Sequence, residues 1–386
     1  MTYNFDEHID RTRTNCAKWT WFGEGVLPMW VADMDFRSPP AIMEALHKRV
    51  ETGVFGYGVC PDGLREVIVE RLQRLYHWTV QPEELIFLPG VVSGIHVTCE
   101  TVGQAGDGVL MTTPVYHPFL DVPLFHRRFV QTPELIRVEN GQDINYEIDF
   151  DAFEATITGQ TSVFVLCNPH NPIGRVFTRD ELARMAEICL KHDVIICSDE
   201  LHCDLLFDDH QHIPTASLSP DIAANTIALF GASKAFNIPG LKLGFAVIQN
   251  PDLYQRFEKW SHTVSGVNVL GYPAMQAAYE HGQAWLDDLL AYLQANRDHA
   301  VDYIKTHLPQ IGTTTPEGTY LLWLDCRNAG IEGNPHEFFL EQAKVAVNDG
   351  GAFGRGGEGF VRLNFGCPRA QLTQALDQMR MALEQG

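Results

Sequence analysis

Ser233 and Lys234 lie in the segment Leu229-Phe-Gly-Ala-Ser-Lys-Ala-Phe-Asn-Ile-Pro-Gly240, just beyond an apolar strand and among small residues. A lysine in such surroundings is desolvated, which lowers the pKa of its ammonium group and frees the amine to attack a carbonyl. This reactivity suits a lysine that forms a Schiff base. Most lysines near strand ends are solvated surface residues, so this segment alone also fits that plainer interpretation.

Two polar residues upstream favour the reactive lysine. Asn171 lies in Asn168-Pro-His-Asn-Pro-Ile-Gly174, and Asp199 follows the predicted strand Val194-Ile-Ile-Cys-Ser198. The polar needs of pyridoxal 5'-phosphate are an acid to pair with its pyridinium nitrogen, an amide to hold its phenolate and a lysine amine. Asn171, Asp199 and Lys234 together therefore predict this cofactor.

Composition excludes several classes of partner. The chain has 386 residues, 45% of them hydrophobic, enough for one large domain with a smaller companion. A formal charge of −21 disfavours nucleic acid and anionic lipid surfaces. The N-terminus lacks a secretory pattern and no apolar run approaches membrane-spanning length, so we expect a cytoplasmic protein without a membrane partner. Nine scattered cysteines fit neither a fully paired disulfide framework nor a metal site.

The pattern from residue 85 onward predicts an α/β fold. Short apolar strands alternate with helices, which is typical of a large, mostly parallel sheet covered on both faces. The predicted strands are 85–88, 108–111, 162–166, 194–198, 226–230 and 244–248. The predicted helices are 41–50, 178–191 and 284–307, others from Val91 and Val115, and a helical stretch from Pro251 through Tyr279.

The C-terminal part predicts a second, smaller α+β domain. It contains two apolar strands, 320–325 and 360–364, a helix from Pro335 and a closing helix. The aromatic, turn-rich N-terminus lacks a regular pattern, so we expect an arm that joins this domain. We therefore divide the chain into an N-terminal arm (1–45), a large cofactor-binding domain (46–285) and a small domain (286–386).

Other candidate site residues follow the carboxyl ends of predicted strands, where open parallel sheets bind their ligands. Gly90-Val-Val-Ser93 begins a helix, so the free amides of Val91 and Val92 could bind a phosphate. An ordinary glycine turn with a serine cap explains this segment equally well. Tyr116 could stack on a planar cofactor, although a lone tyrosine more often serves packing.

Three basic residues complete the candidates. His202 could bind a phenolic oxygen or could be a structural histidine, and Lys242 could offset the charge of a phosphate. Arg362 lies on an apolar strand and needs a carboxylate, either from a ligand or from an internal Asp or Glu. The glycine-rich segment 350–359 lacks the Gly-Lys-Ser/Thr ending of a nucleotide phosphate loop, so we interpret it as a mobile loop beside Arg362.

These motifs, in this order, resemble the fold-type I pyridoxal-phosphate enzymes of the aminotransferase class I/II superfamily. Within it, the chain is similar to the MalY/PatB group of cystathionine β-lyases and related carbon–sulfur lyases. The segments that carry this second resemblance are Asp10-Arg-Thr, Lys18-Trp, Leu27-Pro-Met-Trp-Val-Ala-Asp-Met-Asp-Phe36, Phe55-Gly-Tyr57 and Phe360-Val-Arg-Leu-Asn-Phe-Gly-Cys-Pro-Arg369.

The resemblance implies a role for each candidate. Lys234 would hold the cofactor and transfer the Cα proton, Asp199 would pair with the pyridine nitrogen, and Tyr116 would stack on the ring at the catalytic centre. Asn171 and His202 would lie near the phenolic oxygen. The remaining residues are implied around the phosphate (Val91, Val92, Ser233, Lys242) and at the substrate (Arg362 at its α-carboxylate, with Asn171 and Tyr57 nearby).

Two further implications concern assembly and cofactor affinity. Tyr57 would reach the site from a partner subunit, which implies a homodimer. The chain departs from the family at Gly231, where a serine or threonine often binds the phosphate, and at Lys242, where many relatives carry arginine. Either departure could weaken cofactor binding without changing the reaction.

The activity implied is α,β-elimination from a small amino acid, cystathionine or a related cysteine S-conjugate, which gives a thiol, pyruvate and ammonia. An aminotransferase acting on aromatic or branched-chain amino acids would use the same cofactor-binding residues, so the shared motifs leave it open. The resemblance also leaves open an additional regulatory role through protein binding.

Overall fold

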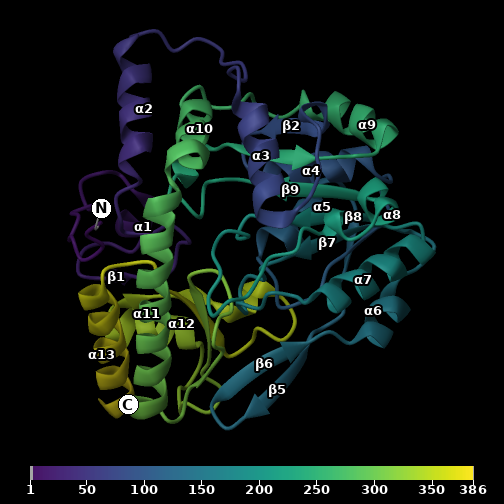
Figure 1. The fold of residues 1–386 in the computed structure, drawn as a ribbon. Helices are drawn as coiled ribbons and strands as arrows, with labels where there is room; N and C mark the ends of the chain where they lie inside the picture. The colour runs from purple at the N-terminus through teal and green to yellow at the C-terminus, as the bar shows by residue number, and fades with distance from the viewer. Residues whose placement is uncertain (1–2, 386) are drawn as a thin grey trace.

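The computed structural model describes residues 3–385, and its centre is a seven-stranded sheet with the order β2-β10-β9-β8-β7-β3-β4 (Figure 1). Strands β4, β3, β7, β8 and β9 run parallel to one another, and β10 is antiparallel to both of its neighbours. The prediction of a mostly parallel sheet is confirmed. The strands are β2 (Leu85–Leu88), β3 (Gly108–Leu110), β4 (Phe129–Gln131), β7 (Thr161–Cys167), β8 (Ile195–Asp199), β9 (Thr226–Phe230) and β10 (Gly244–Val247).

Helices cover both faces of this sheet, which explains why its strands are continuously apolar. Leu229 of β9 packs with α4 (Val91–Thr101), α5 (Pro118–Phe125) and α9 (Pro251–Ser261). Its neighbour Phe230 points the other way, toward α3 (Leu64–Tyr76) and α10 (Gly271–His281). Further along, α6 (Phe150–Thr156), α7 (Arg179–Lys191) and α8 (Pro220–Ala224) cover the second face.

A second sheet lies beside the first and has the order β14-β15-β12-β11-β6-β5. Its strands are β5 (Ile136–Asn140), β6 (Asp143–Glu147), β11 (Gly312–Thr313), β12 (Leu321–Asp325), β14 (Asn348–Asp349) and β15 (Phe360–Asn364). Figure 1 shows the long helix α11 (Gln283–His307) running down to this sheet, beside α13 (Arg369–Gln385). The sequence predicted only β12 and β15 of this sheet. The β5–β6 hairpin also belongs to it, although in the chain it lies between β4 and β7 of the large sheet.

Three predicted helices differ from the observed ones. The helix expected from Val115 begins at Pro118, where proline suits the first turn because it has no N–H to satisfy. The backbone N–H of Val115 donates to the carbonyl of Phe353 (2.9 Å). The stretch 251–279 is two helices, separated by 262–270, where β-branched residues and Gly266 disfavour a helix. From Pro335, the α-helix α12 ends at Phe338 and continues as a π-helical turn, Phe339–Ala343.

The N-terminal arm pairs with the C-terminal part of the chain. It contains α1 (Ala17–Thr20) and β1 (Leu27–Pro28), and β1 pairs with β13 (Val345–Ala346). The next helix, α2 (Pro40–Glu51), projects from the body beside α10 (Figure 1). No helix within residues 3–385 combines the length and apolar character needed to cross a membrane.

Candidate functional site at the carboxyl edge of the large sheet

Three predicted site residues meet at one edge of the large sheet. Asp199 is the last residue of β8, and Asn171 and Lys234 each follow a neighbouring strand by four residues. Because β7, β8 and β9 are adjacent and parallel, their carboxyl ends lie side by side. Each strand thus delivers one polar group to a common place, where open α/β sheets bind ligands.

The amine of Lys234 is held by the N-terminal arm. Its Nζ donates a hydrogen bond to the carbonyl oxygen of Ala32 at 2.7 Å. Burial and the nearby Arg362 guanidinium lower the pKa of Lys234 to about 8, against the opposing effect of Asp33 and Asp199. The lowered pKa increases the fraction of this amine that is neutral, and therefore nucleophilic, close to physiological pH.

Asp199 is a buried acid, 7% exposed, that forms no ion pair within residues 3–385. The backbone N–H of Leu201 donates to its Oδ1 at 3.0 Å. Burial raises the pKa of Asp199 to about 7 despite this bond and the nearby Lys234. A carboxyl group in this position is costly unless a cation joins it, and the protonated nitrogen of a pyridine ring meets that need.

Arg362 on β15 is 2% exposed and is held by three neutral oxygens. Its Nη1 donates to Asn171 Oδ1 (2.9 Å), and its Nη2 donates to Asn348 Oδ1 (2.6 Å) and to the Trp30 carbonyl (3.0 Å). Burial lowers its pKa to about 10, so the guanidinium stays charged at neutral pH. No Asp or Glu of the described chain pairs with it, so the alternative of an internal salt bridge is not observed, and the guanidinium could bind the carboxylate of a ligand.

His202 and Tyr116 flank the same place. The ring of His202 lies edge-on to Tyr320 (6.0 Å between ring centres), and its Nδ1 has no hydrogen-bond partner in residues 3–385. Burial, with the nearby Lys234 and Arg362, lowers the pKa of His202 well below its ordinary value, so the ring is neutral. Burial also raises the pKa of Tyr116, whose half-buried ring packs edge-on against Phe119.

The candidate phosphate site lies at the N-terminus of α4. Gly90 precedes it with a φ of 101°, and no side chain of the described chain caps the helix, so its first amides remain available. The backbone nitrogen of Val91 lies 3.3 Å from the place a Cβ on Gly244 would occupy, so this helix end faces the start of β10, two residues after Lys242.

Close packing explains why position 231 is a glycine. A Cβ at this position would lie 3.1 Å from Leu201 Cδ1 and 3.3 Å from the Leu243 carbonyl oxygen, closer than ordinary contacts. A serine here would require its neighbours to shift, which explains the glycine at this position. Ser233, on the same loop as Lys234, is the nearest predicted hydroxyl along the chain.

Two predicted site residues, Lys242 and Tyr57, have exposed side chains. Tyr57 lies in the irregular segment between α2 and α3, and its side chain is fully exposed. The glycine-rich segment, by contrast, is packed against the site: it begins with a 3-10 turn, Gly350–Phe353, and the buried Phe353 ring lies 5.0 Å from the guanidinium carbon of Arg362.

Sequence reasoning missed the backbone contribution of the arm. The carbonyls of Trp30 and Ala32 bind Arg362 and Lys234, and a carbonyl carries no residue-type signal. Both carbonyls lie in the motif 27–36, which was the available signal in the sequence. The structure shows what an acid of this motif does: Asp35 is 3% exposed and accepts hydrogen bonds from Arg11 (2.6 Å), Lys18 (2.8 Å) and Trp19 (2.9 Å).

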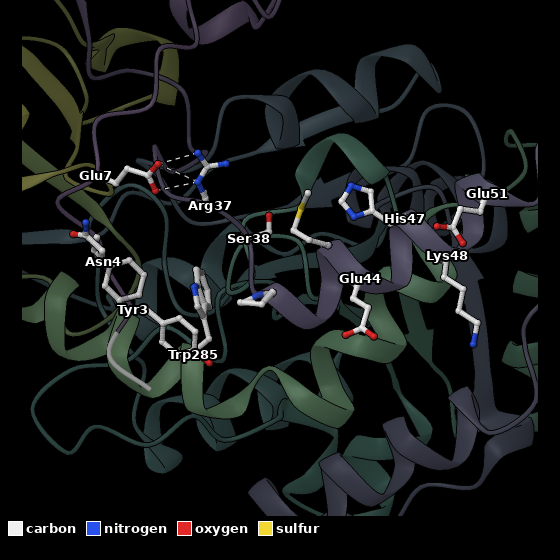
Figure 2. Close-up of a pocket in the computed structure, with 13 residues that line it drawn as sticks. Tyr3, Asn4, Glu7, Arg37, Ser38, Glu44, His47, Lys48, Glu51 and Trp285 are labelled. Atoms are coloured by element: carbon white, nitrogen blue, oxygen red, sulfur yellow. Dashed lines mark hydrogen bonds and ion pairs between the residues drawn. The ribbon is translucent and has the colours of Figure 1, made fainter.

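A separate surface groove of about 870 Å³ contains none of the predicted site residues. It runs between the arm, α2 and the start of α11, and Figure 2 shows Glu44, His47 and Lys48 of α2 along it. Arg37 and Glu7 pair across one end (2.8 Å), and Trp285 forms part of its wall.

The fold and this arrangement define a class of protein. The chain belongs to the aminotransferase class I and II family, whose sequence profile matches residues 19–379. Cystathionine beta-lyase PatB of Bacillus subtilis (strain 168) is 38% identical over 98% of this chain and 100% of the relative. Protein MalY of Escherichia coli (strain K12) is 33% identical over 97% of each chain.

A solved structure agrees with these relatives. Cystalysin from Treponema denticola, which contains a pyridoxal 5'-phosphate cofactor, superposes with a TM-score of 0.94 at 32% identity and covers 100% of both chains. The predicted membership of the fold-type I enzymes, and of the PatB/MalY group within them, is confirmed.

Proposed function

We propose that this protein is a pyridoxal-phosphate-dependent carbon–sulfur β-lyase that converts cystathionine or a related cysteine S-conjugate into a thiol, pyruvate and ammonia. The observation that carries it is the buried Arg362 of β15, a carboxylate-binding group without an acidic partner in the described chain. It donates a hydrogen bond to Asn171 at the edge of the large sheet, where Lys234 has a lowered pKa. Near full-length similarity to cystathionine β-lyases supports cleavage at Cβ.

The residues present fit the cofactor. Asp199 would hold a proton on its pyridine nitrogen, and the neutral His202 and Asn171 would meet its phenolic oxygen. Lys234 would bind its aldehyde carbon. When bound, the cofactor withdraws electrons from Cα of the amino acid, which acidifies the Cα proton and lets a thiolate leave from Cβ. The phosphate would be bound by the amides of Val91 and Val92 with Ser233 and Lys242.

The chain's own groups then carry out positioning and proton transfer. Arg362 binds the α-carboxylate bidentately and so fixes the orientation of Cα. Lys234 removes the Cα proton with its neutral amine, whose pKa of about 8 suits a base at neutral pH. Tyr116 covers one side of the site, and its half-buried ring helps to exclude water.

We also propose that the protein is a homodimer whose subunits complete each other's sites. The groove of Figure 2 is lined by α2 as far as Glu51, and the irregular segment that carries Tyr57 follows this helix in the chain. The surface formed by α2 and this segment exposes several large apolar side chains, and exposed apolar patches mark protein interfaces. Its exposed apolar residues are Met43, Val50, Val54, Phe55, Tyr57 and Val59.

The first test follows pyruvate and free thiol together when the cofactor-loaded protein meets L-cystathionine. We expect equal release of both. Lys234→Ala should slow release by at least about 10³-fold, because the base is lost. Lys191→Ala, which removes an exposed lysine paired with Glu154, is the matched control and should leave the rate unchanged.

Two outcomes would contradict this function. Undiminished pyruvate release by Lys234→Ala would show that Lys234 is not the base. If wild-type protein instead yields a keto acid that keeps the substrate's side chain, with no thiol, the same site supports transamination.

A further inference from the structure

The carbonyl oxygen of Ala32 accepts two hydrogen bonds at once. One comes from Lys234 Nζ at 2.7 Å, and the other comes from the hydroxyl of Tyr320 at 2.8 Å. A carbonyl oxygen has two lone pairs, so its acceptor capacity is filled. The reactive amine and a tyrosine of the small domain therefore share one backbone acceptor.

This acceptor is fixed from both sides. The side-chain amide of Asn364 donates to the carbonyls of Val31 (2.5 Å) and Asp33 (2.7 Å), the two neighbours of Ala32. Tyr320 is 1% exposed, directly precedes β12, and its own carbonyl accepts from the N–H of Phe365 (2.9 Å). The arm backbone is thus anchored to β15 and β12, the strands nearest Arg362.

We propose that Tyr320 is a positioning residue, which holds the Ala32 carbonyl in place to accept a hydrogen bond from the amine of Lys234 whenever that amine is free. A neutral lysine amine has two N–H bonds and one lone pair, so donating one N–H to a fixed oxygen restricts where the lone pair points. Once the amine has taken a proton, the same bond becomes charge-assisted and stabilises the ammonium. The proposal rests on the assignment of Lys234 as the base.

The charged and titratable groups around this amine come from four elements. Arg362 lies on β15, Asp199 ends β8, His202 follows β8, and Asp33 belongs to the arm. Within residues 3–385 none of them forms a hydrogen bond with the Tyr320 hydroxyl, which donates to the Ala32 carbonyl. Removing that hydroxyl therefore takes one of the two hydrogen-bond donors away from the Ala32 carbonyl oxygen and leaves these charges in place.

The experiment compares wild type with Tyr320→Phe by two readouts. In the cofactor-free chain, acetic anhydride labels the free amine of Lys234, and mass spectrometry gives the pH of half-labelling. We expect this pH to rise by up to about one unit, because an acceptor relieved of the tyrosine donor stabilises the ammonium better. In the loaded enzyme we expect kcat to fall about tenfold while KM for cystathionine stays within about twofold, because orientation is lost but binding is kept.

Two further proteins make the result decisive. Tyr303→Phe removes a remote hydroxyl that donates to Asp377 (2.5 Å), and should change neither readout. Tyr320→3-fluorotyrosine keeps the hydroxyl as a stronger donor, so it should lower the half-labelling pH, and it tests the proposal even if the Phe variant fails to fold. An unchanged half-labelling pH in the folded variants, or an unchanged kcat in the folded Tyr320→Phe variant, would overturn the proposal. Because labelling needs no cofactor or substrate, that result is distinct from a wild-type enzyme that releases no pyruvate.

Discussion

Asp199 shows how one residue can trade stability for function. Its carboxyl group is buried without an ion-pair partner in the described chain, and burial raises its pKa to about 7 from an ordinary value of 3.8. Between these two values the folded chain binds more protons than the unfolded chain. The free energy of unfolding therefore falls as pH rises through this window, and the loss remains complete above it.

This argument predicts that Asp199→Asn stabilises the cofactor-free protein at high pH. Relative to wild type, we expect a gain of about 2–4 kcal/mol in the free energy of unfolding at pH 8 and little gain near pH 4, because the acid is protonated there. Urea denaturation of both proteins at the two pH values measures it. Equal differences at both pH values would show that burial does not oppose ionisation of Asp199. The loaded variant should also release pyruvate much more slowly.

At the scale of elements, the strands of the large sheet could be predicted because burial on both faces leaves a continuous apolar run. The strand at Thr226–Phe230 has the predicted bounds, and all five of its residues are buried. The β5–β6 hairpin was missed because its strands are mostly polar and largely exposed. In β6 only Ile144 and Tyr146 are buried, and neither stands in an apolar run.

The N-terminal arm yields a prediction about its buried ion-pair cluster. Asp35→Ala would leave Lys18, which is 2% exposed, with only Asp33 at 3.5 Å as an acidic partner among the described residues. We expect a loss of about 3–5 kcal/mol in the free energy of unfolding, because breaking a buried pair strands a charge. The value of kcat should also fall, since the same arm contains Ala32, whose carbonyl binds the amine of Lys234.

Denaturant unfolding checks this prediction, with Glu154→Gln as the control. Glu154 pairs with Lys191 on the surface, where water and salt screen the interaction, so that variant should unfold like wild type. Equal stability of Asp35→Ala and wild type would mean that the cluster does not anchor the arm.

Across the whole molecule, the site residues that could be predicted are those whose burial costs free energy. Asp199, Lys234 and Arg362 could be found in the sequence because each places a charge in apolar surroundings, which needs a reason. The Ala32 carbonyl could not, because every residue has one and only the folded arm brings it to Lys234. The proposed contact of Tyr57 with a partner's site involves a second chain, so the structure of one subunit does not show it.

The homodimer proposal makes its sharpest prediction through mixed subunits. Tyr57→Ala should weaken each site, and Lys234→Ala should inactivate it. If Tyr57 acts on the partner's site, a hybrid of these two chains contains one site with both residues intact. Mixing the two variants and allowing subunits to exchange should then raise pyruvate release above the sum of the separate variants, since wild-type sites appear only in hybrids. If Tyr57 served its own subunit, no hybrid site would be complete and mixing would add nothing.

A single species of monomer mass in sedimentation, with full activity, would contradict the dimer itself.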